Sequence, residues 1–516
     1  MTDYLIGVDA GNTMVKAALF DLEGRTLAVA ARQSATLQPA PGFVERSPDE
    51  LWKAAAGAIR DCIAQAGIDA ARVRAVGAAG HGNGLYLLDR EGRGLLGIQS
   101  MDSRAGLLAE RLALRHGDEI HRRAQSRPWA AMTPVLLAWL AQEQPELLDR
   151  AGKVLLCKDV IVHGLTGHAG SEVSDLSGCG LLEMPALAYD DGLLDLYGIR
   201  DLRPLLPEAA QSDDVVGHVT AEAAALSGLT EGTPVVAGLF DVLASTLGAG
   251  TTKVGEASIV AGSWSINQVF ADKLPEEPRA ILASVLGRDV WVSCEASPTS
   301  AANLEWFVKN HLADEAAATG EEPFTLCNRL AATSDPEGDL PFFHPYLYAG
   351  PVPGARGGFN GIGSWHSRAD MVRALYEGVA FGHRAHFGIL DPDRRFTRAT
   401  LSGGAAKSPL WAQIFADTLQ MRLRPSDCEE TGARGAAMAA ALGAGLFPDY
   451  DAAAAAMAAH TTELEPDPDA GAILDRRYAR WCAYRDALGA VWAPQQAELV
   501  PFEPRETKTQ ERTSHG

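Results

Sequence analysis

Two aspartates at the ends of apolar runs are placed where they could serve phosphoryl transfer. Asp9 closes the run 4–8 and precedes a small polar turn, and Asp241 closes the run 235–240. Phosphoryl transfer to an alcohol uses one carboxylate to accept the hydroxyl proton and another to orient a hydrated Mg²⁺ ion. The pattern predicts Asp241 as the general base and Asp9 as the magnesium-side carboxylate. A helix N-cap at Asp241 and a solvated turn after Asp9 are the alternative interpretations.

The segment 10–13 is predicted to be the tip of a β-hairpin, because a second apolar run follows it at 14–21. Such a tip suits a phosphate chain, since backbone N–H groups and a hydroxyl can donate to phosphate oxygens while a lysine offsets their charge. The candidate phosphate-binding residues of this hairpin are Gly11, Asn12, Thr13 and Lys16.

A similar pattern returns at 256–270, where an apolar run breaks at Gly262 and Ser263 and then resumes. Two such hairpins, one in each half of the chain, indicate a duplicated architecture with paired phosphate-binding turns that face a cleft. The stretch 248–255 between them is rich in Gly and Thr and is predicted to be a hinge.

The stretch 401–411 has the pattern of a strand end, a glycine pair and a helix start. Gly403 and Gly404 would let a planar ring or a phosphate approach the backbone closely. The spacing excludes a Walker P-loop and a dinucleotide-binding glycine motif. The small residues at 429–437 could form a second face for an adenine, and close helix packing is the alternative.

A further group of residues could recognise the hydroxyls of a polyol. His81 and Asn83 lie in a Gly-rich stretch, and Asp102 and Arg104 follow it in the chain. Neutral donors and acceptors of this kind suit a small polar ligand that does not itself react with them. A Gly-rich turn and a surface Asp-Arg pair are the alternatives.

The chain has 516 residues, which is too long for one core and predicts two domains. Lys and Arg number 45 and Asp and Glu 66, so the net charge of −21 argues against a nucleic-acid partner. No stretch has the layout of a signal peptide or a membrane span, and the 7 Cys form no C-x-x-C. We therefore expect a cytoplasmic protein with reduced thiols and no membrane partner. His383-x-x-His386 has no evident third metal ligand, which favours a core or surface role. A homodimer is compatible with the sequence.

The candidate site residues must be positioned by strands and helices, which the sequence predicts in alternation. Strand-like runs lie at 73–78, 85–88, 154–156 and 235–237. Ser47 is predicted to cap a helix, with Glu50 completing a capping box. The Ala-rich stretch 451–460 and the stretch around Trp481 are predicted helices, and residues from 501 a loose polar tail.

The order of these motifs, from about residue 4 to 485, resembles the FGGY family of carbohydrate kinases. The motifs that carry the resemblance are Asp9-x-Gly11-x-Thr13, Asp102-x-Arg104, Gly238-x-x-Asp241, Gly262-Ser263, Gly403-Gly404-Ala405-x-Lys407-Ser408, Glu430-x-Gly432 and the segment 357–378. The segments 238–242, 295–300 and 303–307 are most similar to the L-xylulose kinases of that family.

The resemblance implies an α/β fold with two ribonuclease-H-like domains, of the actin-like ATPase and glycerol-kinase type, around a central cleft. Residues 1–250 would form the N-terminal domain on the sugar and phosphate side. Residues 256–490 would form the C-terminal domain on the nucleotide side, and 491–516 a polar tail. Closure of the domains over ATP and Mg²⁺ would exclude water.

The resemblance also implies roles for individual residues, with Asp241 the base and Asp9 the magnesium-side carboxylate. The residues implied to contact ATP are Gly11, Asn12, Thr13, Lys16, Gly262, Ser263, Gly403, Gly404, Ala405 and Lys407. The residues implied to contact the sugar are His81, Asn83, Asp102, Arg104 and Asp241.

The implied reaction is ATP-dependent phosphorylation of a ketopentose, such as L-xylulose to its 5-phosphate. The sequence departs from the family at Leu136, where a signature has Lys, and at 9–12, which lacks the usual Gly-Thr-Thr. His81 and Asn83 stand where relatives often carry Gln and His or Lys. Kinases for xylulose, ribulose, 3-keto-gulonate, erythritol or glycerol are the alternatives. A non-kinase ATPase of the same actin-like fold is the competing class, and it would lack stimulation by a sugar.

Overall fold

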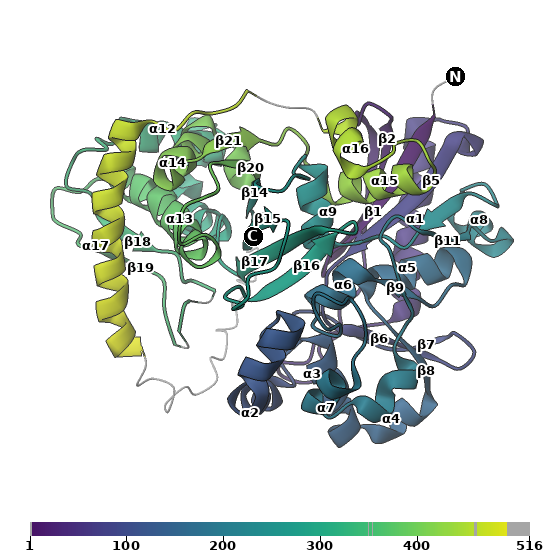
Figure 1. Ribbon diagram of the computed structural model, residues 1–516. Helices are drawn as coiled ribbons and strands as arrows, with labels where there is room; N and C mark the ends of the chain where they lie inside the picture. The colour runs from purple at the N-terminus through teal and green to yellow at the C-terminus, as the bar shows by residue number, and fades with distance from the viewer. Residues whose placement is uncertain (1–2, 349, 353, 459–461, 493–516) are drawn as a thin grey trace, which may run out of the picture.

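A large sheet in each half of the chain carries one of the predicted hairpins (Figure 1). The computed structural model describes residues 3–348, 350–352, 354–458 and 462–492. The first sheet has the order β11-β12-β5-β1-β2-β3, with β13 also paired to β5. Its strands are β1 (Tyr4–Ala10), β2 (Met14–Asp21), β3 (Thr26–Gln33), β5 (Val73–Gly80), β11 (Val215–His218), β12 (Pro234–Val236) and β13 (Leu239–Phe240).

The second sheet has the order β16-β17-β15-β14-β20-β21. Its strands are β14 (Ala257–Ala261), β15 (Ser265–Ala271), β16 (Leu282–Leu286), β17 (Val290–Ser297), β20 (Arg398–Gly403) and β21 (Arg422–Pro425). β1 is antiparallel to β2 and parallel to β5, and β14 is antiparallel to β15 and parallel to β20. Both predicted hairpins are therefore present, and each lies beside a parallel neighbour.

Helices cover both sheets, and a smaller sheet with the order β4-β7-β6-β8 lies in the first half. Its strands are β4 (Glu45–Arg46), β6 (Leu85–Asp89), β7 (Gly94–Ile98) and β8 (Ala151–Leu155). The helices of the first half are α1 (Pro48–Ala66), α2 (Gly106–Ala124), α3 (Thr133–Glu143), α4 (Pro145–Arg150), α5 (Cys157–Thr166), α6 (Val173–Gly178), α7 (Asp191–Tyr197), α8 (Ala221–Ser227) and α9 (Asp241–Gly248). Those of the second half are α10 (Ala302–Phe307), α11 (Ala313–Thr319), α12 (Pro323–Thr333), α13 (Arg368–Leu390), α14 (Pro409–Leu419), α15 (Thr431–Gly443), α16 (Tyr450–Met457) and α17 (Pro468–Trp492). The remaining short strand pairs are β9 (Ser171–Glu172) with β10 (Ala209–Ala210) and β18 (Phe342–His344) with β19 (Gly358–Asn360).

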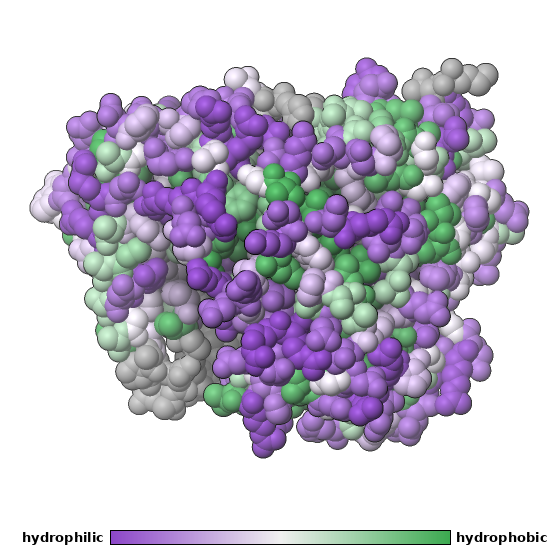
Figure 2. All heavy atoms as spheres, in the orientation of Figure 1, coloured by the Kyte–Doolittle hydropathy of each residue, from purple (hydrophilic) through white to green (hydrophobic). Residues whose placement is uncertain are grey.

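Packing crosses the midpoint of the chain. Figure 1 shows α15 and α16, yellow-green, among the purple strands of the first sheet. A Cβ on Gly7 would lie 1.7 Å from the carbonyl oxygen of Ala433, and one on Gly435 1.9 Å from that of Ala244. Contacts this close require glycine, so Gly435 serves helix packing, as the alternative interpretation stated. Glu429 and Thr431 line a large cavity, so an adenine face at 429–437 stays a prediction. Figure 2 shows hydrophobic residues gathered on this face near α9, β16 and β17, where the two halves meet. The division of the chain at 250 and 256 stays a prediction.

The predicted strands appear in the structure with ends that coincide or are shifted by up to three residues. Ser47 caps α1 by accepting from the backbone N–H of Glu50 at 3.4 Å. The predicted helix 451–460 corresponds to α16, although 459–460 lie outside the described residues. Of the predicted tail 491–516, residues 491 and 492 end α17 and 493–516 lie outside the described part. In that described part, no helix is both long enough and apolar enough to cross a membrane.

Candidate active site

The two predicted carboxylates come from neighbouring elements of the first sheet. Asp9 lies near the end of β1, and Asp241 begins α9 directly after β13. Both β1 and β13 are parallel to β5, so their carboxyl ends meet at one edge of the sheet. Phe240, and not Asp241, occupies the cap position of α9 and makes no side-chain capping bond. The N-cap interpretation of Asp241 is therefore wrong.

The charges of these carboxyls interact. Burial raises the pKa of Asp241 to about 8, repulsion from Asp9 adds to the shift, and the backbone N–H groups of Val242 and Gly82 oppose it. Burial raises the pKa of Asp9 to about 6, with repulsion from Glu430 adding and Lys16 opposing. A strongly shifted carboxyl beside a second one is typical of a functional site.

The turn after Asp9 is closed by a hydrogen bond from the Gly11 N–H to the carbonyl of Met14, 3.0 Å long. Thr13 at its tip is exposed. Lys16 faces Asp9 across the hairpin and pairs with Glu430 at 3.0 Å. Lys16, which was predicted to offset phosphate charge, is therefore paired with a carboxylate of the protein.

Gly432 lies directly against Asp9. A Cβ at this position would lie 2.4 Å from the Oδ2 atom of Asp9. The glycine at the start of α15 thus leaves room for the carboxylate, which is a structural reason for the Glu430-x-Gly432 motif.

The second predicted turn lies beside the predicted glycine pair. Gly262 donates to the carbonyl of Trp264 at 3.2 Å, and Ser263 between them is exposed. Gly403 pairs with Ala261 on the neighbouring strand, and its φ of 84° requires glycine. A Cβ on Gly403 would lie 2.8 Å from the backbone nitrogen of Gly262, so the sheet brings both motifs together.

A cavity of about 910 Å³ lies beside Gly403 and Gly404. The residues that line it and that matter here are Val260, Asn328, Gly403, Gly404, Ala406, Lys407, Trp411 and Asp427. Its volume fits the 300–1,000 Å³ usual for ligand sites. Ala405 is fully buried in the core instead of lining the cavity, and Lys407 pairs with Glu429 at 2.5 Å.

The predicted sugar residues lie in two loops at the edge of the first sheet. His81 is buried, and its Nε2 atom lies 3.1 Å from the Tyr86 hydroxyl. Burial lowers the pKa of His81 to about 3, so its ring is neutral. A Cβ on Gly82 would lie 2.2 Å from the Phe240 ring, which places the His81–Asn83 loop against the residue before Asp241.

Asp102 and Arg104 form a fully buried ion pair at 2.8 Å, which excludes the surface-pair alternative. Arg104 also pairs with Glu45 at 2.8 Å and stacks 4.0 Å from the ring centre of Phe43. Among the described residues, the buried atoms Oδ1 of Asn83 and Nη1 of Arg104 have no hydrogen-bond partner. Unpartnered buried polar atoms are costly unless a ligand or water completes them, so these loops fit a polyol.

The chain matches the N-terminal domain of the FGGY family of carbohydrate kinases over residues 4–248 and its C-terminal domain over 257–444. It belongs to that family. The enzyme is therefore a carbohydrate kinase with the two-domain α/β fold expected from the sequence, and kinases of this family use ATP. The competing class, a non-kinase ATPase of the same fold, is excluded by this membership.

Relatives of the kinase include several sugar kinases. The chain is 33% identical over 491 residues to the L-xylulose/3-keto-L-gulonate kinase of Escherichia coli K12, covering 93% of this chain and 96% of that protein. It is 28% identical over 518 residues to the autoinducer-2 kinase of Enterobacter sp. 638, covering 95% of each. The crystal structure of xylulose kinase from Rhodospirillum rubrum superposes with a TM-score of 0.86 at 27% identity, covering 95% of this chain and 100% of that one.

Sequence reasoning missed a buried charged cluster near Asp241. Lys158 is fully buried and lies 2.6 Å from Asp159 and 3.4 Å from both Glu172 and Asp175. Ser174, between those two acids, accepts from the backbone N–H of Phe240 at 3.1 Å. The cluster thus stabilises β13, the strand directly before Asp241. The signal available in the sequence was a Lys-Asp pair inside the apolar run 154–162.

His383 and His386 belong to a buried polar network and not to a metal pair. His383 Nδ1 lies 2.8 Å from Oδ1 of Asn267, and its Nε2 lies 2.9 Å from the Ser300 hydroxyl. Burial lowers the pKa of His386 to about 4. No group of three or more His, Cys, Asp or Glu side chains able to hold a metal ion occurs in the described part of the kinase.

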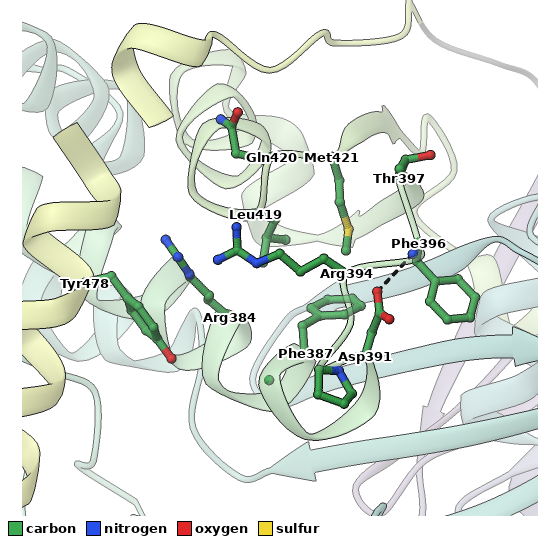
Figure 3. A pocket seen from close by; sticks show the side chains of 12 residues that line it. Arg384, Phe387, Asp391, Arg394, Phe396, Thr397, Leu419, Gln420, Met421 and Tyr478 are labelled. Atoms are coloured by element: carbon green, nitrogen blue, oxygen red, sulfur yellow. Dashed lines mark hydrogen bonds between the residues drawn. The ribbon is translucent and has the colours of Figure 1, made fainter. Parts of the chain in front are cut away.

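A smaller cavity of about 160 Å³ lies between α13, α14 and α17 (Figure 3). Arg384 on its wall is already paired with Asp475 at 2.6 Å and stacked over Tyr478. Asp391 accepts from the backbone N–H groups of Arg395 and Phe396. No predicted site residue lines this cavity, so it is separate from the candidate active site.

Proposed function

We propose that this kinase transfers the γ-phosphoryl group of ATP to the terminal hydroxyl of a ketopentose, with L-xylulose to its 5-phosphate as the leading reaction. The observation that carries the proposal is the position of Asp241 beside the loop of Gly82 and Asn83, where the buried Oδ1 atom of Asn83 has no hydrogen-bond partner among the described residues. The relative named L-xylulose/3-keto-L-gulonate kinase, matched over nearly the whole chain, supports the substrate class.

In the proposed mechanism Asp241 accepts the proton of the reacting hydroxyl. The N–H groups of Val242 and Gly82 favour its ionised form, so they help to hold it as a base. His81, Asn83, Asp102 and Arg104 would position the remaining hydroxyls. Neutral His81 can donate or accept but cannot add charge, which suits an uncharged sugar.

Asp9 is the residue we propose for the magnesium side. A Mg²⁺ ion usually keeps several waters and takes one or two protein carboxylates together with substrate phosphates, so a site without three clustered ligands fits it. When bound, the ion supplies charge neutralisation on the phosphate oxygens. The half-buried position of Asp9 at the sheet edge is suited to holding its water shell.

The nucleotide would span both halves of the kinase. The N–H groups of Asn12 and Thr13 in the first turn and of Ser263 in the second would hold phosphates, and those of Gly11 and Gly262 close the turns. The cavity beside Gly403 would hold the adenosine. Lys16 and Lys407 would exchange their glutamate partners for phosphate oxygens. Closure of the halves would then exclude water from the transferred group.

The test is a panel of acceptors with purified enzyme, measured as ADP release. The panel comprises L-xylulose, D-xylulose, L-ribulose, 3-keto-L-gulonate, autoinducer-2, erythritol and glycerol. We expect the highest kcat/KM with L-xylulose and strong rejection of acceptors that leave buried polar groups unpaired. A higher kcat/KM with glycerol, erythritol or autoinducer-2 than with every ketopentose would overturn the substrate assignment.

A further inference from the structure

The phosphate turn of the first hairpin is held from behind by two buried side chains. The Nη2 atom of Arg46 donates to the carbonyl of Gly11 at 3.1 Å and also to that of Asn12. The Nε2 atom of Gln99 donates to the same Asn12 carbonyl at 2.6 Å. Arg46 is 1% exposed and Gln99 is fully buried. Both side chains donate to carbonyls of the turn and the Gly11 N–H closes it, so the turn is fixed without use of the N–H groups of Asn12 and Thr13 in these bonds.

The side chain of Asn12, which was predicted to contact ATP, is bonded instead to the segment 99–104, here called the sugar loop. Its Nδ2 atom lies 3.0 Å from the Ser100 hydroxyl, which in turn lies 3.3 Å from its Oδ1 atom. Ser100 opens the segment 100–104 that carries the buried Asp102–Arg104 pair. A side chain of the phosphate turn is thus bonded to the start of the loop predicted to read the sugar.

Strand β4 makes a second connection between these regions. Its two residues alternate in direction, as successive residues of a strand do. Arg46 holds the phosphate turn, and Glu45 pairs with Arg104 at 2.8 Å. β4 is itself paired with β7, the strand that leads into Gln99 and Ser100. A displacement of either region would therefore strain the same two-residue strand.

We propose that Arg46, Gln99 and the Asn12–Ser100 pair are positioning residues that couple the phosphate turn to the sugar loop. Nucleotide bound at the turn would order residues 99–104, and sugar bound at the loop would favour the turn conformation that binds nucleotide. Such coupling is reciprocal, so each ligand strengthens the other by the same factor. The sugar half of this proposal rests on the proposed function, whereas the nucleotide half does not.

The first experiment needs no sugar. Hydrogen exchange of the full-length kinase is measured with and without saturating Mg²⁺ and a non-hydrolysable ATP analogue, with binding verified by calorimetry. In the native chain we expect slower exchange both in peptides covering 8–16 and in peptides covering 99–106. In Asn12→Gly and in Ser100→Ala the protection at 8–16 should remain and that at 99–106 should be lost.

Ser103→Ala is the matched control. It removes another hydroxyl of the same loop, one that donates to Gly42 at 3.3 Å and does not touch Asn12. This variant should keep protection at both places. Arg46→Met removes a buried charge and can fail to fold, so the two milder variants decide the outcome. Protection at 99–106 that is absent in the native chain, or that survives in Asn12→Gly and Ser100→Ala, would overturn the proposal.

The second experiment measures the affinity for L-xylulose with and without the ATP analogue. We expect the native ratio to be about 5-fold or more and the ratio in Asn12→Gly to be near 1. A ratio that is unchanged in the variant would overturn the coupling. If L-xylulose does not bind the native kinase at all, the substrate assignment fails, and the exchange experiment still decides the nucleotide half.

Discussion

The two large sheets share one strand pattern and carry different chemistry. The sequence of neighbours β12-β5-β1-β2 in the first matches β21-β20-β14-β15 in the second. In both, a hairpin turn begins at a glycine, Gly11 or Gly262, whose N–H closes it. In both, a glycine-rich loop follows the parallel neighbour strand, at Gly80 or Gly403. The pattern therefore places equivalent loop ends along each sheet edge.

The residues at these ends differ in kind. In the first hairpin Asp9 faces Lys16, and in the second Val260 faces Ile266. The loop after β5 is buried and polar at His81 and Asn83, whereas the loop after β20 borders an open cavity. The same framework thus presents two carboxyls at one sheet edge and an open cavity at the other, because chemistry resides in loop-end residues and not in the sheet.

The largest expected effect is the removal of Asp241, because it is the carboxylate proposed to accept the proton of the reacting hydroxyl. Asp241→Asn should lower kcat by roughly 10²- to 10⁴-fold, the range for loss of a general base. Steady-state kinetics with L-xylulose measure this, and calorimetry with an ATP analogue should show affinity within a few-fold of native. Near-native turnover would remove Asp241 from the mechanism.

Asp9→Val gives the first hairpin the residue found in the second. Loss of a group that orients a hydrated metal should weaken the apparent Mg²⁺ affinity by about 10- to 100-fold. The measurement is initial rate against Mg²⁺ concentration at fixed ATP. Val260→Ala, the matched change in the second hairpin, should leave the Mg²⁺ dependence unaltered, and an unaltered dependence in Asp9→Val would refute the assignment.

The raised pKa of Asp241 predicts an effect on stability that no group in the second hairpin should produce. In the folded chain this carboxyl has a pKa of about 8 against 3.8 for an ordinary Asp. Between those values the folded state binds a proton that the unfolded state has lost, so native stability falls as pH rises. Without metal or nucleotide, Asp241→Asn should therefore raise the melting temperature over native by an amount that grows from about pH 5 to about pH 8, on the order of a few degrees. A difference that shrinks with rising pH would contradict the shift.

The smallest effect is expected at Lys407. Its pair with Glu429 is exposed on both sides, at 65% and 71%, and exposed ion pairs contribute about 0–1 kcal/mol at most. Lys407→Met should leave the melting temperature nearly unchanged and weaken the ATP analogue only a few-fold. Lys16→Met, whose partner Glu430 is 14% exposed, should weaken it more. The reverse order would mean that the second half dominates phosphate binding.

The sequence by itself determined the fold class, the two hairpins and the carboxylate at the start of α9. These are local signals: apolar runs broken by Gly and small polar residues, in an order that matches the FGGY family. It also selected polar residues that prove to be buried and a glycine pair that lies beside the large cavity, and the ligands of both stay predictions. The sequence left two interpretations open where only burial could decide between them, as for the Asp102–Arg104 pair, which could have been a surface pair.

Only the tertiary structure decided which distant residues meet. Glu430 with Lys16, Gly432 with Asp9 and Asn12 with Ser100 are separated by 414, 423 and 88 positions, and no local pattern marks such pairs. They meet because α15 returns to the first sheet and because β4, which pairs with β7, contacts the turn after β1 through Arg46. Contacts of this kind follow from the packing of whole elements, in which close approach at glycines and the pairing of buried charges select the partners.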